Sequence, residues 1–253
     1  MESAIELDDH EAEAHCYLGE AIRALEWNYS AEERELERAL DLDPNSAICH
    51  LFLGMLLASR GEHDRVWTEL ATAEKLDPLS PMISNFHGSL LLSAGRVEEA
   101  LAKGLRTKEI DPTYVYFESS LAQAYREQGK FAESIAEYKR EETMSGETPP
   151  GLAITYARMG RTDEARQILQ QLEAAARTRY VEADLIAAIY VALGDNDRAF
   201  QWLERAFAEH SAPLEGIGTR LDFKPLASDP RFPAFLRRIG LDPAKFPNRP
   251  WEK

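Results

Sequence analysis

Only two of the 253 residues are cysteines, Cys16 and Cys49, and their spacing matches no metal-binding motif. This excludes a disulfide-stabilised scaffold and a zinc protein, and we expect both thiols to be free and partly buried. The longest apolar run, 51–58, is far shorter than the roughly 20 residues that cross a bilayer, so no membrane partner is expected. The first fifteen residues are acidic and lack the apolar core of a secretory signal. Cytoplasmic residence is therefore the expected location.

Basic residues are also scarce. The chain has 29 Lys and Arg against 44 Asp and Glu, a net charge of −15, which argues against nucleic acid as a partner because phosphate binding needs a basic surface. The charge is uneven, at −11 over residues 1–45 and +4 over residues 220–253. A solvated acidic end is the simpler interpretation. Weak homo-oligomers that join the acidic end of one copy to the basic end of another are the alternative.

The sequence contains no set of residues that demands catalysis. Its six histidines are scattered, and His63, which follows Glu62 and precedes Asp64, lacks the second histidine of a zinc-binding helix. No serine lies in a nucleophile elbow, and 216–218 is not a phosphate loop. His87 is expected to be a hydrogen-bonded interior histidine, because a lone imidazole has no partners to form a site. We predict a protein that is not an enzyme, with no catalytic residue, metal or cofactor.

A period of 34 residues runs along the chain. It is visible in three prolines, Pro44, Pro78 and Pro112, and in three glycines, Gly61, Gly95 and Gly129. Two further glycines, Gly160 and Gly194, continue it after a shortening by three residues. Such a period means that one supersecondary unit is stacked many times, each copy burying its apolar face against the next. The chain is therefore predicted to be a solenoid.

The third copy carries a recognisable pattern, in which Gly88 and Leu91 precede the turn at Gly95, followed by Ala100 and Pro112. This pattern resembles the tetratricopeptide repeat. The resemblance covers almost the whole chain and implies an all-α, right-handed α-solenoid of about six helix-turn-helix repeats with a C-terminal capping helix. We place the solenoid at 1–212 and the capping helix and tail at 213–253. The apolar stripe of that helix is Phe232, Phe235, Leu236 and Ile239, at i, i+3, i+4 and i+7.

The recurring glycines and prolines have structural explanations. The turn glycines supply the left-handed conformation that ends a helix. The residue before each proline is pushed out of the helical region, so the prolines close the second helices. Gly54 and Gly88 lie inside first helices, where glycine costs about 1 kcal/mol relative to alanine. Close approach of two helix backbones is the expected compensation.

Two stretches resemble a narrower group. Residues 25–36, which include Trp27, and the closing 223–232 are similar to the tetratricopeptide arms of bacterial multidomain signalling regulators, which follow winged-helix, kinase or cyclase domains. None of those output domains is present. Residues 4–9 look like the end of a further second helix, which suggests that the chain begins partway through a repeat and that a fused domain precedes it. The first full copy is also irregular, since Leu18 and Gly19 lie one residue out of phase with Trp27 and Pro44. We therefore expect its inter-helix turn to carry one extra residue.

In the tetratricopeptide family the first helix of each repeat lines a concave groove that holds an extended peptide or a partner helix. Carried onto this sequence, the groove residues are Met82, Asn85, Ser89, Tyr116, Ser119, Gln123 and Arg126. Their amides can pair with a ligand backbone, and Tyr116 offers a rigid amphipathic surface. Ordinary solvent-facing helix positions are the competing interpretation. We therefore expect a non-catalytic protein-interaction module that binds a peptide or helix, with a ligand-sensing regulatory arm and a self-assembling scaffold as alternatives.

Overall fold

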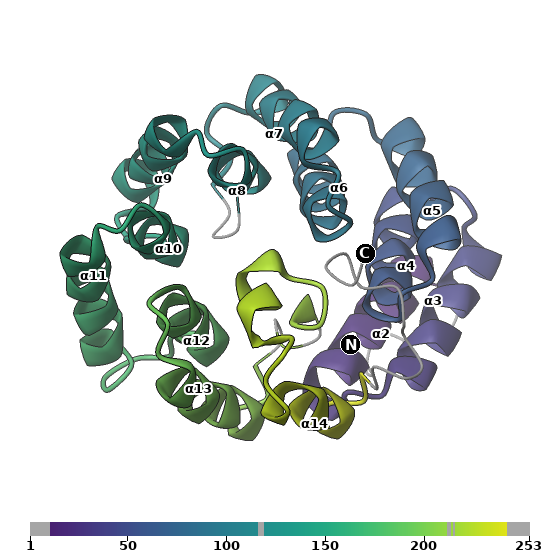
Figure 1. Cartoon of the computed structure of the whole chain (residues 1–253). Helices are drawn as coiled ribbons and strands as arrows, with labels where there is room; N and C mark the ends of the chain where they lie inside the picture. Colours follow the sequence, from purple (N-terminus) through teal and green to yellow (C-terminus); the bar gives the residue numbers. More distant parts are fainter. Residues whose placement is uncertain (1–10, 116–118, 212–213, 215, 242–253) are drawn as a thin grey trace.

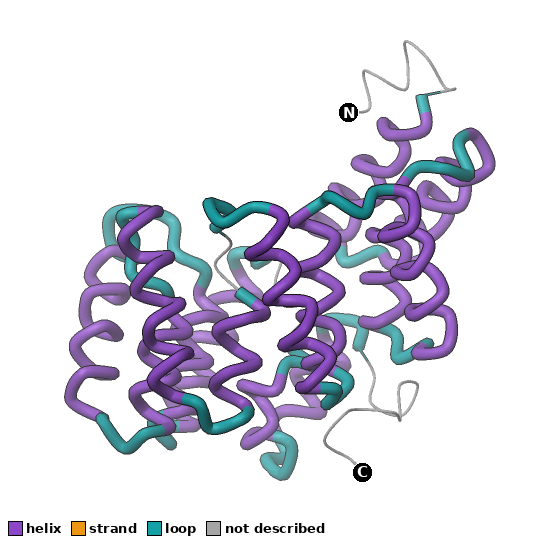
Figure 2. Tube along the Cα trace, turned by 90° about the horizontal axis from the view of Figure 1, so that it is seen from above, coloured by secondary structure: helices purple, strands orange, loops and turns teal. Residues whose placement is uncertain are grey.

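The computed structural model describes residues 11–115, 119–211, 214 and 216–241, apart from the side chains of His63 and Asp64. Within this part the chain contains helices and loops and no strand (Figure 2), and twelve helices form six consecutive antiparallel pairs. The helices are α2 (Ala12–Glu26), α3 (Tyr29–Leu42), α4 (Ala47–Ser59), α5 (His63–Leu76), α6 (Pro81–Ser93), α7 (Val97–Ile110), α8 (Ser120–Glu127), α9 (Phe131–Ser145), α10 (Pro150–Arg158), α11 (Thr162–Ala175), α12 (Ala183–Ala192) and α13 (Asn196–Ala208).

The pairs stack into a strongly curved array. The first helices of the pairs, from α4 to α12, line the inside of the curve, and the second helices, from α5 to α13, form its outer layer (Figure 1). The predicted α-solenoid of helix-turn-helix repeats is confirmed.

The recurring residues end the helices as predicted. The turn glycines adopt positive φ values of 72° to 78°, which a residue with a Cβ atom rarely adopts. In the repeats that carry a proline, the second helix ends two residues before it, for example at Leu76 before Pro78. The aspartate between them, Asp77, accepts a hydrogen bond from the backbone N–H of Leu79 and so stabilises the following turn.

A neighbouring helix approaches Gly88 closely, through the side chain of Ser120 rather than through its backbone, but Gly54 has no such close neighbour. A Cβ atom at Gly88 would lie 2.6 Å from Oγ of Ser120, which is closer than a real contact allows. At Gly54 the nearest atoms, in Leu70, would be 3.4 Å away, an ordinary van der Waals distance. The prediction for Gly54 is therefore wrong, and an alanine would fit there.

The two cysteines are not free. Cys16 of α2 and Cys49 of α4 form a disulfide, with their Cα atoms 5.6 Å apart and both side chains fully buried. Their separation of 33 residues is close to the repeat length, so the stacking places them side by side in adjacent first helices. The prediction of free thiols was wrong because it considered cysteine number and motif spacing but not the repeat register. Cytoplasmic residence stays a prediction.

The chain after α13 turns back into the curve. A 3₁₀ segment, η2 (Leu221–Leu226), lies in the middle of the array, and α14 (Arg231–Arg238) lies beside α13 (Figure 1). The four apolar residues predicted for the capping helix are all buried: Phe232, Phe235, Leu236 and Ile239. They share a hydrophobic core with α12 and α13. The capping helix is confirmed, and the division at residue 212 stays a prediction.

The first repeat contacts the last helices. Trp27 stacks on His210, with ring centroids 4.7 Å apart, and packs against Phe207. The hydroxyl of Tyr29 donates a hydrogen bond to the carbonyl of Ile239, 210 residues away, over 3.2 Å. Burial raises the pKa of Tyr29 to about 12. These contacts join the two ends of the array into a ring.

The irregularity of the first repeat lies in its first helix. α2 has 15 residues, against 13 in α4 and α6, and the turn to α3 consists of Trp27 and Asn28 alone. The prediction of an extra residue in the turn is therefore wrong: the added length lies in α2, and it brings Trp27 to α13. The predicted remnant helix at 4–9 and the tail from residue 242 lie outside the described residues.

Candidate partner-binding surface

The C-terminal segment already occupies part of the inner wall. Arg126 on α8 donates a hydrogen bond from Nη2 to Oδ1 of Asp222 in η2 over 2.7 Å. Arg126 is only 2% exposed. Burial disfavours its charge, but Asp222, Tyr138 and Glu127 together outweigh burial and raise the pKa of the guanidinium. Burial likewise acts against the carboxylate of Asp222, and Arg126 with Arg158 and Arg220 outweighs it and lowers its pKa. The two groups form an ionised pair inside the ring.

A second buried carboxylate holds the segment at the far end of the wall. Asp184 on α12 is fully buried and lies 2.7 Å from Nη1 of Arg220. Its other oxygen accepts a hydrogen bond from the Ser211 hydroxyl over 2.9 Å. Together, Asp222 and Arg220 fix the segment against α8 and α12. The polar side chains of α8 and α12 at these two positions therefore bond to the chain's own C-terminal segment.

The predicted groove residues divide into two groups. Asn85, Ser119 and Arg126 have structural partners: Asn85 Oδ1 accepts from the backbone N–H of Ser120 over 3.1 Å, and Ser119 caps α8 by accepting from the N–H of Ala122. Met82, Ser89 and Gln123 are partly exposed on α6 and α8. Tyr116 lies outside the described residues. Peptide binding by any of the seven stays a prediction.

The first helix of the second repeat carries partly exposed apolar residues that are not among the predicted groove residues. Ile48 and Met55 on α4 lie 34 residues before Met82 and Ser89, and both are partly buried against the core. Phe52, on the same helix, makes an edge contact with the ring of Tyr17 at 5.8 Å. Extending the same repeat positions back by one period would have found Ile48 and Met55. We call six residues the open wall. They are the three on α4 and the three partly exposed predicted residues: Ile48, Phe52, Met55, Met82, Ser89 and Gln123.

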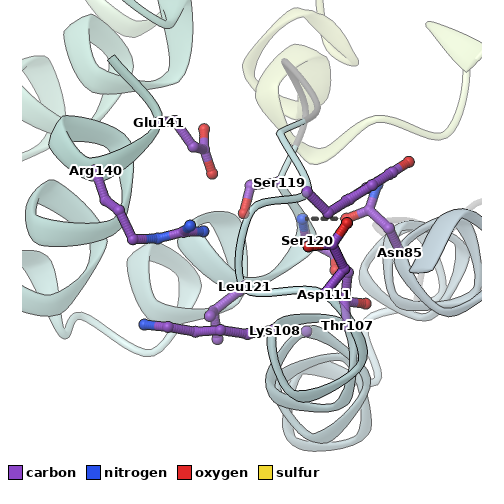
Figure 3. A pocket seen from close by; sticks show the side chains of 11 residues that line it. Asn85, Thr107, Lys108, Asp111, Ser119, Ser120, Leu121, Arg140 and Glu141 are labelled. Atoms are coloured by element: carbon purple, nitrogen blue, oxygen red, sulfur yellow. Dashed lines mark hydrogen bonds between the residues drawn. The ribbon is translucent and has the colours of Figure 1, made fainter. Parts of the chain in front are cut away.

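A narrow polar hollow lies between the third and fourth helix pairs (Figure 3). Asn85 contributes from α6, Ser119, Ser120 and Leu121 from the start of α8, and Arg140 and Glu141 from α9. The remaining lining residues come from α7 and the loop that follows it: Gly104, Thr107, Lys108, Asp111 and Tyr114. The hollow therefore spans both layers of the solenoid.

Glu141 makes the stability of this region depend on pH. Burial raises its pKa from 4.5 to about 7, and a hydrogen bond from Ser119 and the charge of Arg140 offset this only in part. The folded chain binds the proton more tightly than the unfolded chain, so stability falls as pH rises through this range. Glu141→Gln should stabilise the protein by roughly 1–2 kcal/mol at about pH 8 and change little at about pH 5.

Urea unfolding across this pH range checks the expectation, with the exposed Glu133→Gln as the matched control. Burial also raises the pKa of Glu32, to about 8, so the Glu141 variant should reduce the pH slope without abolishing it. An unchanged slope would mean that Glu141 is hydrated or charged in the folded protein.

The comparisons with known proteins agree with the repeat pattern. The family model of the tetratricopeptide repeat matches residues 151–171, which form the fifth helix pair, α10 and α11. The other pairs share its period and turn glycines. Residues 151–171 therefore match a tetratricopeptide repeat, and the chain as a whole has the fold of a helix-turn-helix solenoid. The search of curated proteins gave no match.

Two solved structures share the tetratricopeptide-repeat fold over most of the chain. PilF of Pseudomonas aeruginosa aligns with a TM-score of 0.56 at 21% identity, covering 82% of this chain and 95% of PilF. PilW, a widely conserved type IV pilus biogenesis factor, aligns with a TM-score of 0.58 at 21% identity, covering 78% of this chain and 92% of PilW. These likenesses establish the fold. A regulatory domain fused to this chain stays a prediction.

In the described part of the chain, no helix is long and apolar enough to span a bilayer. The same residues contain no group of three or more His, Cys, Asp or Glu side chains that could hold a metal ion. His87 lies 2.9 Å from the carboxylate of Glu74, as expected of an interior histidine with a polar partner.

Proposed function

We propose that this chain is a non-catalytic tetratricopeptide-repeat scaffold that binds a peptide or helix of a protein partner on the open wall. One observation carries the proposal. Met55, Met82 and their neighbours on consecutive first helices stay partly exposed, whereas the C-terminal segment is fixed by side chains of α8 and α12. The open wall therefore extends over the second to fourth repeats, and the later part of the groove belongs to the chain itself.

The chemistry of the open wall suits a partner with apolar anchors. Phe52 and the two methionines, Met55 and Met82, offer aromatic and flexible apolar surface, which adapts to side chains of different shape. Ser89 and Gln123 add hydroxyl and amide groups that can pair with a ligand backbone. This combination favours an amphipathic helix or an extended apolar peptide.

The test begins with peptides selected from a random displayed library on the full chain, followed by affinity measurement by fluorescence anisotropy. Met82→Ala and Gln123→Ala should each weaken binding by about 1–2 kcal/mol, roughly fivefold to thirtyfold, because both remove contact surface from the open wall. Met144→Ala is the matched control, since Met144 is an exposed methionine on the outer helix α9. Selected peptides whose affinity does not respond to the open-wall variants would contradict the proposal.

A further inference from the structure

We propose that the hollow between the third and fourth helix pairs is a second binding site, and that its ligand is a primary carboxamide, the group at the end of asparagine and glutamine side chains. This inference goes beyond the open wall. Apart from Ser119 at the start of α8, the partly exposed lining residues belong to α7, α9 and the loop after α7, whereas the open wall lies on first helices.

Asn85 supplies an unused hydrogen-bond donor. The residue is 3% exposed, and its Oδ1 accepts from the backbone N–H of Ser120. That bond fixes the orientation of the amide, because the reversed amide would place an N–H group against another N–H group. Nδ2 is then a donor that has no hydrogen-bond partner among the described residues. A buried donor without a partner costs free energy, so an acceptor that reaches it is favoured.

Glu141 supplies the complementary atom. It is 2% exposed, and the Ser119 hydroxyl, which also caps α8, hydrogen-bonds to its carboxyl group. Its Oε2 is buried without a hydrogen-bond partner in the described part of the chain. This oxygen can accept a hydrogen bond from a ligand N–H. Figure 3 shows Asn85 and Glu141 reaching the hollow from helices on its two sides.

The charges around the hollow favour a neutral ligand. Lys108 and Arg140 are each hydrogen-bonded to Glu137, and Arg140 also donates to the carbonyl of Pro112, so both cations are already engaged. A carboxylate ligand would lie near Glu141, and an ammonium ligand would lie near the N–H groups of Asn85. A carboxamide can accept from Asn85 through its oxygen and donate to Glu141 through its nitrogen. It is a small planar group that satisfies both unpaired atoms.

The test titrates the full chain, labelled with ¹⁵N, with acetamide, acetate and methylammonium as probes of matched size. Acetamide should shift the side-chain amide signals of Asn85 in a saturable way, with an apparent affinity at least fivefold better than that of either charged probe. Tighter binding of acetate or methylammonium would overturn the assignment. So would the absence of saturable binding of all three, because the two unpaired atoms would then be served by water alone.

Variants separate the site from the open wall. Glu141→Leu should weaken acetamide binding at least fivefold, whereas Glu141→Gln should retain it, since a glutamine carbonyl can also accept the hydrogen bond. Gln123→Ala is the control, because Gln123 belongs to the open wall and does not line the hollow. Equal effects of Glu141→Leu and Glu141→Gln would contradict the proposed hydrogen bond. Loss of peptide binding on the open wall with retained acetamide binding would count against the proposed function alone.

Discussion

Replacing Asp222 by alanine is expected to destabilise the protein by about 3–5 kcal/mol, because the guanidinium of Arg126 would remain buried without its nearest counter-charge, and Glu127 approaches it only to 3.5 Å. Arg126 is 2% exposed, and the Asp222 carboxylate lies 2.7 Å from its Nη2. Removing the carboxylate would also loosen η2, in which the next residue, Phe223, is fully buried in the C-terminal core. Chemical unfolding followed by circular dichroism measures the loss.

Two further variants test the assigned cause. Asp222→Ala combined with Arg126→Met removes both charges and should recover much of the stability, because no unpaired charge stays buried. Glu204→Ala breaks the pair between Glu204 and Arg238, whose side chains are about half exposed, and should cost no more than about 1 kcal/mol. A loss at Asp222 as small as that at Glu204 would show that Arg126 reaches water when its partner is removed.

Most of the fold was predictable from the sequence because the repeat carries its own register. Once a 34-residue period is found, a turn glycine such as Gly95 and a closing proline such as Pro112 place the helix ends in the copies that carry them. The capping helix was predictable for a similar reason, since its apolar stripe has the spacing of a single buried helix face. The local sequence pattern is enough to predict the fold where each repeat contacts only its neighbours.

The contacts between the ends of the array could not be predicted in this way. No period relates Trp27 to His210, or Arg126 to Asp222, which are 96 residues apart. Two stretches involved in these contacts were recognisable in the sequence, but nothing in the sequence indicated what they contact. The tryptophan-containing stretch and the closing 223–232 stood out as motifs, and the structure shows that the first meets α13 and the second fills the middle of the ring.

The positions of the candidate binding residues could be predicted from the sequence. Whether their polar groups are free to bind a ligand could not. The repeat register places Met82, Asn85 and Gln123 on first helices, where the structure has them. It does not indicate that Asn85 bonds to the next helix or that Arg126 is taken by the C-terminal segment. Both outcomes depend on long-range packing. A buried polar side chain usually forms a hydrogen bond within the chain, and it is then not free to bind a ligand.

Gly104→Leu should destabilise the protein by about 3 kcal/mol, even though leucine is the better helix former. A Cβ atom at Gly104 would lie 2.6 Å from Cα and 2.8 Å from the backbone nitrogen of Leu121. Backbone cannot move aside as a flexible side chain can, so α7 and α8 would have to separate. The equivalent positions of other repeats hold large buried residues: Leu36, Leu70, Tyr138, Leu169 and Leu203. Leucine therefore restores the repeat pattern and disrupts the packing, and thermal unfolding measures the result.

Gly54→Ala is the matched control, because Gly54 also lies inside a helix and a Cβ atom there meets Leu70 at an ordinary 3.4 Å. This variant should be neutral or stabilise the protein by up to about 1 kcal/mol, the gain in helix propensity. If Gly104→Leu were also neutral, α8 would have room to shift outward, and the fixed approach of α7 to α8 would be wrong. Separation of α7 from α8 should also weaken the pair between Arg126 and Asp222, since Arg126 lies on α8. Combining Gly104→Leu with Asp222→Ala should then cost less than the sum of the two single changes, because both disturb the same contact.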